Sequence, residues 1–263
     1  MRGWLIYDEE GAKRNAWFIS RLTELAARSR ISLTLKIYPF DISAEKLPDF
    51  ALVRTIFPAL NRQLEEKGVR CINNAKTAYI ANDKWETYRF CKENAIPVLP
   101  TWQGAPQEFP CVVKTVDGHG GKEVLWIHSP AEYQTIAADW TAQGRKFIAQ
   151  KPCAVLGKDM RAYVVGGEIV AAVLRSSQTD FRSNFSLGGN VECVQPTDEQ
   201  REIVQRIYNQ LQADYIGVDF LPDGEKWVVN EIEDSAGARM LYQCTDIDIA
   251  DVFVSYLVGS LKA

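Results

Sequence analysis

Apolar and polar residues along the first eighty positions follow the periods of strands and of one helix. Three segments have the apolar or alternating pattern of a strand: residues 3–8, 31–38 and 49–54. Between the first two, Phe18, Leu22 and Leu25 recur at helical spacing, which predicts an amphipathic helix. Strand–helix–strand order is typical of a small α/β unit, so we expect an α/β domain over residues 1–80.

The pattern beyond residue 80 predicts a mainly β region interrupted by helices. Asn82 and Asp83 are suited to cap a short helix that ends before Pro97. Strands are expected over residues 110–116, 123–127, 146–152, 160–175 and 217–233. The last two segments contain hairpin turns at Gly166-Gly167 and at Asp223-Gly224. Further helices are expected over residues 199–213 and 246–262.

Composition and charge restrict the class of protein. With 263 residues, 46% hydrophobic and 24% charged, the chain suits one large or two to three small cooperating globular domains. Its net charge of −4 argues against non-specific nucleic-acid binding as a main activity. The start turns acidic too early for a secretory signal, no apolar run reaches membrane-spanning length, and the six cysteines form no CxxC pair. We therefore expect a cytoplasmic protein without membrane or nucleic-acid partners, and homo-oligomer formation is left open.

A glycine-rich loop follows an apolar strand that ends in a lysine. Lys114 lies at the end of this strand, and Gly118, Gly120 and Gly121 follow. Glycines let backbone N–H groups approach phosphate oxygens, and a lysine supplies positive charge. The loop is not a P-loop, because GxxxxGK[ST] is absent and a strand rather than a helix follows. The alternative interpretation is a flexible hairpin turn with an exposed lysine.

A group of polar residues lies on and around the hairpin expected over residues 160–175. Arginine matches the geometry of phosphate and carboxylate through paired hydrogen bonds, so such a group is suited to form a donor-rich wall for anions. Its members are Asp159, Arg161, Arg175, Arg182 and Asn184. The alternative is a set of solvated charges at the ends of hairpin strands.

Three carboxylates of the last hairpin are candidates for a metal site. A two-residue turn at Asp223-Gly224 would place Asp219 and Glu231 on opposite faces, because side chains alternate along a strand. An odd loop or a bulge near residues 222–225 would instead bring Asp219, Glu231 and Glu233 to one face. Three oxygen donors on one face would suit Mg²⁺ or Mn²⁺. The alternative is a hairpin with a solvated acidic side.

Taken together, the order and spacing of these segments resemble the ATP-grasp superfamily and, within it, the RimK-like α-L-glutamate ligases. The motifs that carry the resemblance are NDKW, PCVVKTVDGHGG, FIAQKP, GKDMRAYVVGGEIVAAVLR, DFRSNFSLGGNVE, GVDFL and NEIEDSAG. The resemblance implies a fold of α/β and α+β class, the ATP-grasp fold preceded by an α/β preATP-grasp domain. The implied division is residues 1–80 for the preATP-grasp domain, 81–150 for a small lid subdomain, and 151–263 for the subdomain that binds metal and nucleotide.

The resemblance also implies roles for individual residues. Arg161, Arg175 and Arg182 would face phosphate or the acyl substrate as catalytic groups. The metal, Mg²⁺ or Mn²⁺, would be bound by Asp219, Glu231 and Glu233. ATP would be bound by Lys84, Lys114, Gly118, Gly120, Gly121, Gln150, Lys151, Pro152, Cys153, Asp159, Arg182, Ser183 and Asn184.

The activity implied by the resemblance is that of an ATP-dependent carboxylate–amine ligase. Such an enzyme forms an acylphosphate, releases ADP and phosphate, and joins a small carboxylate to an amine, here an amino acid or peptide. Four positions depart from the family pattern: Lys151 replaces a carboxylate, Glu123 a glycine, Glu233 an asparagine and Ala236 a proline. Two alternatives stay open, an ATP-grasp kinase that phosphorylates a small molecule and a non-catalytic nucleotide-binding protein.

Overall fold

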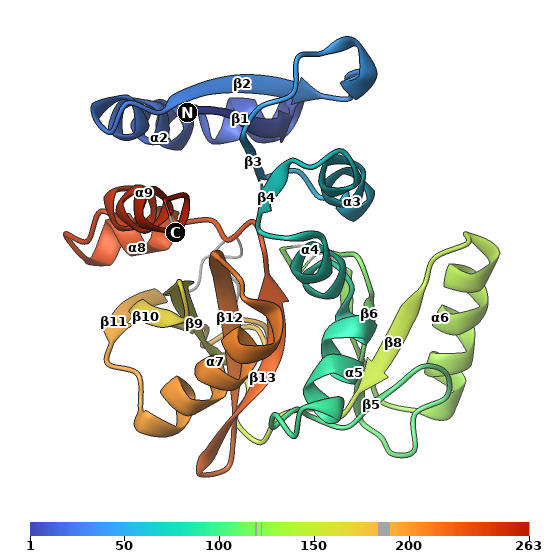
Figure 1. Ribbon diagram of the computed structural model, residues 1–263. Helices are drawn as coiled ribbons and strands as arrows, with labels where there is room; N and C mark the ends of the chain where they lie inside the picture. Colours follow the sequence, from blue (N-terminus) through green and yellow to red (C-terminus); the bar gives the residue numbers. More distant parts are fainter. Residues whose placement is uncertain (119, 122, 184–189, 263) are drawn as a thin grey trace.

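In the part of the chain that the structure describes, the strands form three separate sheets (Figure 1). The computed structural model describes residues 1–118, 120–121, 123–183 and 190–262. The mixed α/β composition agrees with the fold class expected from the sequence. The division of the chain at residues 80 and 150 stays a prediction, although each sheet draws its strands from one of the three expected parts.

The first sheet is parallel, with the order β2-β1-β3-β4. Its strands are β1 (Arg2–Asp8), β2 (Ser32–Tyr38), β3 (Phe50–Val53) and β4 (Arg70–Ile72). The associated helices are α1 (Glu9–Arg14), α2 (Ala16–Arg28), the short 3-10 helix η1 (Ile42–Ala44), α3 (Pro58–Glu66) and α4 (Ala75–Ala81). The predicted amphipathic helix is confirmed as α2, because Phe18, Leu22 and Leu25 are all buried.

The second sheet is antiparallel, with the order β5-β8-β6-β7. Its strands are β5 (Thr101–Trp102), β6 (Cys111–Thr115), β7 (Val124–Ile127) and β8 (Phe147–Gln150). The helix α5 (Lys84–Glu93) precedes the sheet, and α6 (Pro130–Ala142) lies on its far side (Figure 1). As predicted, Asp83 caps α5, since its side chain accepts hydrogen bonds from the backbone N–H groups of Trp85 and Glu86.

The third sheet has five antiparallel strands in the order β11-β10-β9-β12-β13. These strands are β9 (Lys158–Val165), β10 (Glu168–Ser176), β11 (Asn190–Val194), β12 (Tyr215–Asp223) and β13 (Lys226–Glu233). Three helices complete this part: α7 (Asp198–Leu211), α8 (Arg239–Cys244) and α9 (Ile249–Ser260). The predicted turn at Gly166-Gly167 is confirmed, because Val165 pairs with Glu168.

The two faces of the third sheet have different neighbours, because side chains alternate along each strand. On β9, Ala162 and Val164 pack in a core with residues of α4, α5 and α7. Tyr163 and Val165 point the other way, into a core shared with β1, α2 and α9. Asp159 lies on that second face but near the opposite end of β9, where the apolar core gives way to charged side chains.

One expectation about local structure is corrected, and several elements were not expected. The turn between β12 and β13 lies at Gly224-Glu225 rather than at Asp223-Gly224, because Asp223 pairs with Lys226. Several elements were not predicted: α3, α4, α6, α8, β4 and β11. Within the described part of the chain, no helix has both the length and the apolar character needed to cross a membrane.

Candidate active site

A pocket open to solvent lies between the second and third sheets. Counted with its open part, it has a volume of about 830 Å³. Most residues that the sequence nominated for nucleotide or metal line this pocket: Lys84, Lys114, Gly118, Gly120, Gly121, Gln150, Lys151, Pro152, Cys153, Asp159, Arg182, Ser183, Asp219, Glu231 and Glu233. Arg161 and Arg175 do not line it but lie buried behind its acidic side chains. Asn184 lies outside the described residues.

The pairing of β12 with β13 brings the acidic residues together. Asp219 pairs directly with Glu231, and Gly217 with Glu233, which confirms that Asp219 and Glu231 share one side of the hairpin. The register shifts between Asp219 and Phe220, where Asn230 is the extra residue on β13. The predicted bulge therefore exists, but it lies at Asn230 rather than near residues 222–225.

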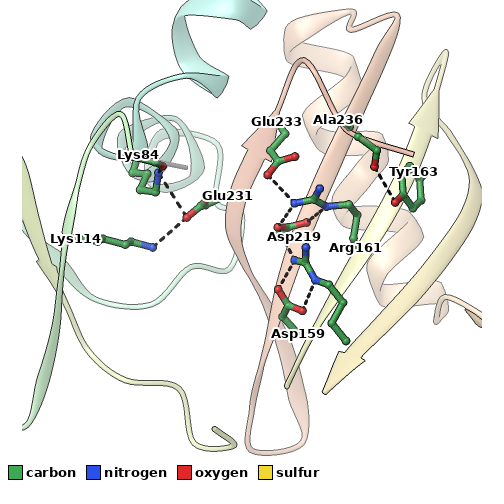
Figure 2. Close-up of polar contacts among 12 residues, drawn as sticks. Lys84, Lys114, Asp159, Arg161, Tyr163, Asp219, Glu231, Glu233 and Ala236 are labelled. Carbon is green, nitrogen blue, oxygen red and sulfur yellow. Dashed lines mark hydrogen bonds and ion pairs between the residues drawn. The ribbon is translucent and has the colours of Figure 1, made fainter. Parts of the chain in front are cut away.

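Two lysines converge on Glu231 from the side of the second sheet (Figure 2). The Nζ atoms of Lys84 and Lys114 lie 3.8 and 3.6 Å from its Oε1. Lys114 also donates a hydrogen bond of 2.9 Å to Oδ1 of Asn230, and Lys84 donates one to the carbonyl oxygen of Gly118. Burial lowers the pKa of Lys114 to about 8, against the opposing effect of Glu231. Both ammonium groups are thus held inside the pocket, poised for anionic ligands.

Arg161 binds Asp219 and Glu233 on the other side of the cluster (Figure 2). Its Nε and Nη2 donate to the two oxygens of Asp219 at 2.7 Å each, and Nη2 also donates to Oε1 of Glu233 at 2.6 Å. Burial alone would raise the pKa of Asp219, but the charges of Arg161 and Arg175 outweigh it and lower that pKa. Burial raises the pKa of Glu233.

Arg175 extends this network from Asp219 to Asp159, which also lines the pocket. It donates to both oxygens of Asp159, and its Nη2 lies 2.7 Å from Oδ2 of Asp219. Burial raises the pKa of Asp159 despite this partner. Arg161 and Arg175 therefore do not contact the cavity themselves. They hold in place the carboxylates that line it, so the structure gives them a positioning role.

The glycine loop is shaped by steric limits and by Arg182. A Cβ atom on Gly118 would lie 2.2 Å from Oγ1 of Thr115, so only glycine fits there without movement. Arg182 donates from Nη1 to the carbonyl oxygen of Gly121 at 2.7 Å, which ties residues 180–183 to the loop. Glu123, one of the positions at which the sequence departs from the pattern that it resembles, accepts hydrogen bonds from Thr115 and Arg145.

The opposite end of the pocket is mainly apolar and was not predicted from the sequence. Its lining side chains are Leu99, Val112, Val124, Leu156, Phe181 and Leu221. The alternation of side chains along β6 could have indicated this apolar lining. Cys111 and Val113 are buried in a core, so Val112 must face the other way. The neighbouring segment 150–151 is fixed by hydrogen bonds from the Gln150 side chain to Thr101 and from the Lys151 N–H to the carbonyl oxygen of Pro100. An apolar slot next to a polar end suits a planar base followed by phosphates.

The acidic cluster has suitable donors for a divalent cation. The carboxylates of Asp219, Glu231 and Glu233 and the amide of Asn230 all line the pocket, and oxygen ligands are those that Mg²⁺ and Mn²⁺ prefer. Over residues 1–118, 120–121, 123–183 and 190–262, however, no three Asp, Glu, His or Cys side chains converge as a metal site. Two of these carboxylates instead share a cation from the protein, because Nη2 of Arg161 donates to both Asp219 and Glu233.

Comparison with known proteins shows the family of the chain. Residues 92–257 match the family described as the RimK-like ATP-grasp domain. The chain is 26% identical to a probable alpha-L-glutamate ligase of Haemophilus influenzae, over 74% of this chain and 69% of that protein. It is similar in fold to the crystal structure of a D-cycloserine synthetase, with a TM-score of 0.76, 17% identity and coverage of 99% and 100%. A similar fold occurs in the ATP-grasp ligase PsnB solved with a variant of its minimal precursor, Mg and ADP, with a TM-score of 0.70, 13% identity and coverage of 99% and 98%.

Proposed function

The chain belongs to the RimK-like ATP-grasp family of ATP-dependent ligases, and we propose that it joins a carboxylate to an amine through an acylphosphate. One observation carries the proposal: a single pocket combines an apolar slot, a glycine loop, two buried lysines and an acidic hairpin. ATP would place its base in the slot and its phosphates beside Lys84 and Lys114. The substrate carboxylate would attack the γ-phosphate, ADP would leave, and the amine would then displace phosphate.

The residues of the pocket supply binding and charge stabilisation rather than a nucleophile. Charge that develops on the transferring phosphoryl group would be stabilised by Lys84 and Lys114, which approach from one side. Glu231 and Glu233 would hold Mg²⁺, which neutralises phosphate charge when bound. The glycine loop, tied to Arg182, would cover the phosphates and exclude water from the acylphosphate.

The substrates that we propose are a small carboxylate and an amine, one of them an amino acid or a peptide. The name of the Haemophilus relative, an alpha-L-glutamate ligase, and the precursor bound by PsnB support this class. We further propose that residues 81–150 act as the lid and residues 151–263 as the part that holds the acidic hairpin. A screen of carboxylates and amines for ADP and phosphate release, with mass spectrometry of the products, tests the chemistry. A phosphorylated product without an amide would replace the ligase by a kinase.

The metal assignment is tested by ATP turnover measured against Mg²⁺ and Mn²⁺ concentration. Glu231→Gln keeps the shape of the side chain but removes its charge, so turnover should fall at least about tenfold while circular dichroism stays unchanged. Glu233→Asn restores the residue usual in the family and should retain substantial turnover with a higher metal requirement. Glu225→Gln, in the turn of the same hairpin and exposed, is the control. Wild-type turnover by Glu231→Gln at limiting metal would contradict the assignment.

A further inference from the structure

Two cysteines that do not line the pocket bring their sulfur atoms into contact. Cys193 lies on β11, the edge strand of the third sheet, and Cys244 is the last residue of α8. Their Sγ atoms are 3.3 Å apart although the residues are 51 positions apart in the chain. Of the other cysteines, Cys71 and Cys91 are fully buried in apolar surroundings.

The two thiols differ in their exposure to solvent. Cys193 is exposed, whereas Cys244 is half-buried, with its Sγ 3.2 Å from the carbonyl oxygen of Met240. Burial raises the pKa of Cys244 to about 11, and the neighbouring Cys193 thiol adds to this effect. An oxidant in solution therefore meets Cys193 first, and Cys244 stands behind it as a protonated partner.

We propose that Cys193 and Cys244 form a reversible redox modification site, in which a peroxide oxidises the pair to an intramolecular disulfide. The Cys193 thiolate attacks one peroxide oxygen, the O–O bond breaks, and a sulfenic acid and hydroxide form. The Cys244 sulfur then attacks the sulfenic sulfur, its proton leaves with the departing hydroxyl as water, and the S–S bond forms. With hydrogen peroxide, two thiols and one peroxide give one disulfide and two waters. A small thiol such as dithiothreitol reverses the reaction.

The disulfide would link β11 to α8, and α8 leads back to the candidate active site. α8 follows residues 234–238, which connect it to Glu233, and this connection is held by Arg54 at the carbonyl oxygen of Ala236 and by Tyr163 at that of Gly237. The closed loop between the two cysteines contains α7 and the entire β12–β13 hairpin. Oxidation therefore fixes the hairpin's connection to α8 against the edge of the sheet without drawing distant parts together, since the two sulfurs already touch.

Peptide mapping of the full chain after treatment with hydrogen peroxide tests the proposal. The native protein should lose about 2 Da per chain and give one linked peptide pair containing Cys193 and Cys244, and dithiothreitol should restore the mass. Cys193→Ser and Cys244→Ser should each abolish the linked pair. Cys153→Ser, which alters a half-buried cysteine elsewhere, should leave it intact. Oxygen adducts without the linked pair, or a link between other cysteines, would overturn the site.

Thermal unfolding provides a second measurement. A disulfide that closes a loop of this length should raise the melting temperature of the oxidised protein on the order of 5 °C or more, because it restricts the unfolded chain. The shift should vanish on reduction and be missing in both single variants. A melting temperature that is unchanged or lower after complete disulfide formation would show that the bond strains the fold. It would contradict the proposal that the two cysteines are already placed to form the bond.

Discussion

Cationic side chains offset the repulsion among the neighbouring carboxylates of Asp219, Glu231 and Glu233. Lys84 and Lys114 approach Glu231, while Arg161 lies between Asp219 and Glu233. Four cationic side chains thus face four acidic ones: Lys84, Lys114, Arg161 and Arg175 against Asp159, Asp219, Glu231 and Glu233. The cluster is balanced before any nucleotide binds. If ATP binds as proposed, its phosphates would compete with Glu231 for the two lysines.

A substitution of Lys114 tests whether this single side chain contributes to ATP binding. Lys114→Met removes a buried ammonium while keeping most of the apolar stem, and a charge-assisted hydrogen bond contributes about 1.5–3 kcal/mol. We expect ATP affinity, measured by calorimetry, to fall roughly 10- to 150-fold. Lys92→Met, on the exposed side of α5, is the control and should bind ATP like the wild type. Unchanged affinity in Lys114→Met would show that the lysine does not meet the phosphates.

A substitution of Arg161 tests how much the same network of buried ion pairs contributes to the stability of the fold. Arg161→Met leaves the buried carboxylate of Asp219 with one cationic partner fewer, and breaking a buried ion pair typically destabilises by about 3–5 kcal/mol. We expect a loss of this order in the free energy of urea unfolding. Arg62→Met removes an ion pair with Glu66 in which the arginine side chain is 79% exposed, and should change stability by less than about 1 kcal/mol. Equal effects of the two substitutions would contradict the importance of the buried network.

At the scale of elements, the β12–β13 hairpin shows what the sequence could and could not predict. The alternation of side chains showed that Asp219 and Glu231 could share one face only with a bulge or an odd loop. It did not show where in the hairpin that irregularity lies. Val229 and Ile232 both pack in the core on one face, although three positions separate them. A regular strand would turn them to opposite faces, so the extra residue must lie between them, and it is Asn230. The spacing of these two apolar residues was the signal that locates the bulge.

Other elements were missed for different physical reasons. Ser129, Pro130 and Glu132 form a helix start, and the Ser129 side chain caps α6, but the apolar residues of α6 are too sparse to form a clear stripe. β11 has one buried neighbour strand and alternates only weakly, so its pattern resembles a loop. By contrast, the candidate site residues could be named from the sequence, because the order of their motifs along the chain resembles that of the RimK-like ATP-grasp family. The apolar slot carries no such motif.

The two glycine turns of the third sheet allow a matched prediction. Gly166 (φ +57°) and Gly224 (φ +67°) both have positive φ, which disfavours alanine by roughly 1–2 kcal/mol. A Cβ atom on Gly166 would also lie 2.4 Å from the ring of Tyr256, whereas nothing lies within 4 Å at Gly224. We expect Gly166→Ala to lower the free energy of unfolding by about 2–4 kcal/mol, and Gly224→Ala by clearly less. Similar losses in urea unfolding would mean that the ring moves aside freely.

At the scale of the whole molecule, the first and third sheets are joined by polar side chains as well as by a common core. Asn73 exchanges hydrogen bonds with the backbone of Tyr215, accepting from its N–H at 2.9 Å and donating to its carbonyl at 2.7 Å. Arg54 donates to the carbonyl oxygen of Ala236 at 2.9 Å and lies over the ring of Tyr215. The sheet that carries the acidic hairpin is therefore held by residues from the start of the chain, and the N-terminal part should not be removable without loss of the site.

Asp214 is the buried charge at this junction and gives a pH-dependent prediction. Its carboxylate is 4% exposed, and it accepts hydrogen bonds from Arg70 of β4 at 3.2 Å and from Tyr256 of α9 at 3.1 Å. Burial raises the pKa of Asp214 above its ordinary value of 3.8, even though Arg70 opposes the shift. The folded protein therefore retains this proton to higher pH than the unfolded chain does. The resulting contribution to stability is complete below about pH 4 and is lost as pH rises through the folded-state pKa.

Asp214→Asn removes this titration while keeping an acceptor for Arg70 and Tyr256. We expect the free energy of unfolding of the wild type, measured by urea titration at several pH values, to fall relative to that of the variant from about pH 4 towards neutrality. Each unit by which the pKa is raised corresponds to about 1.4 kcal/mol of this relative change. Parallel pH profiles for the two proteins would show that the Arg70 charge cancels the effect of burial. A relative rise for the wild type would show that the Arg70 charge outweighs burial and lowers the pKa of Asp214 instead of raising it.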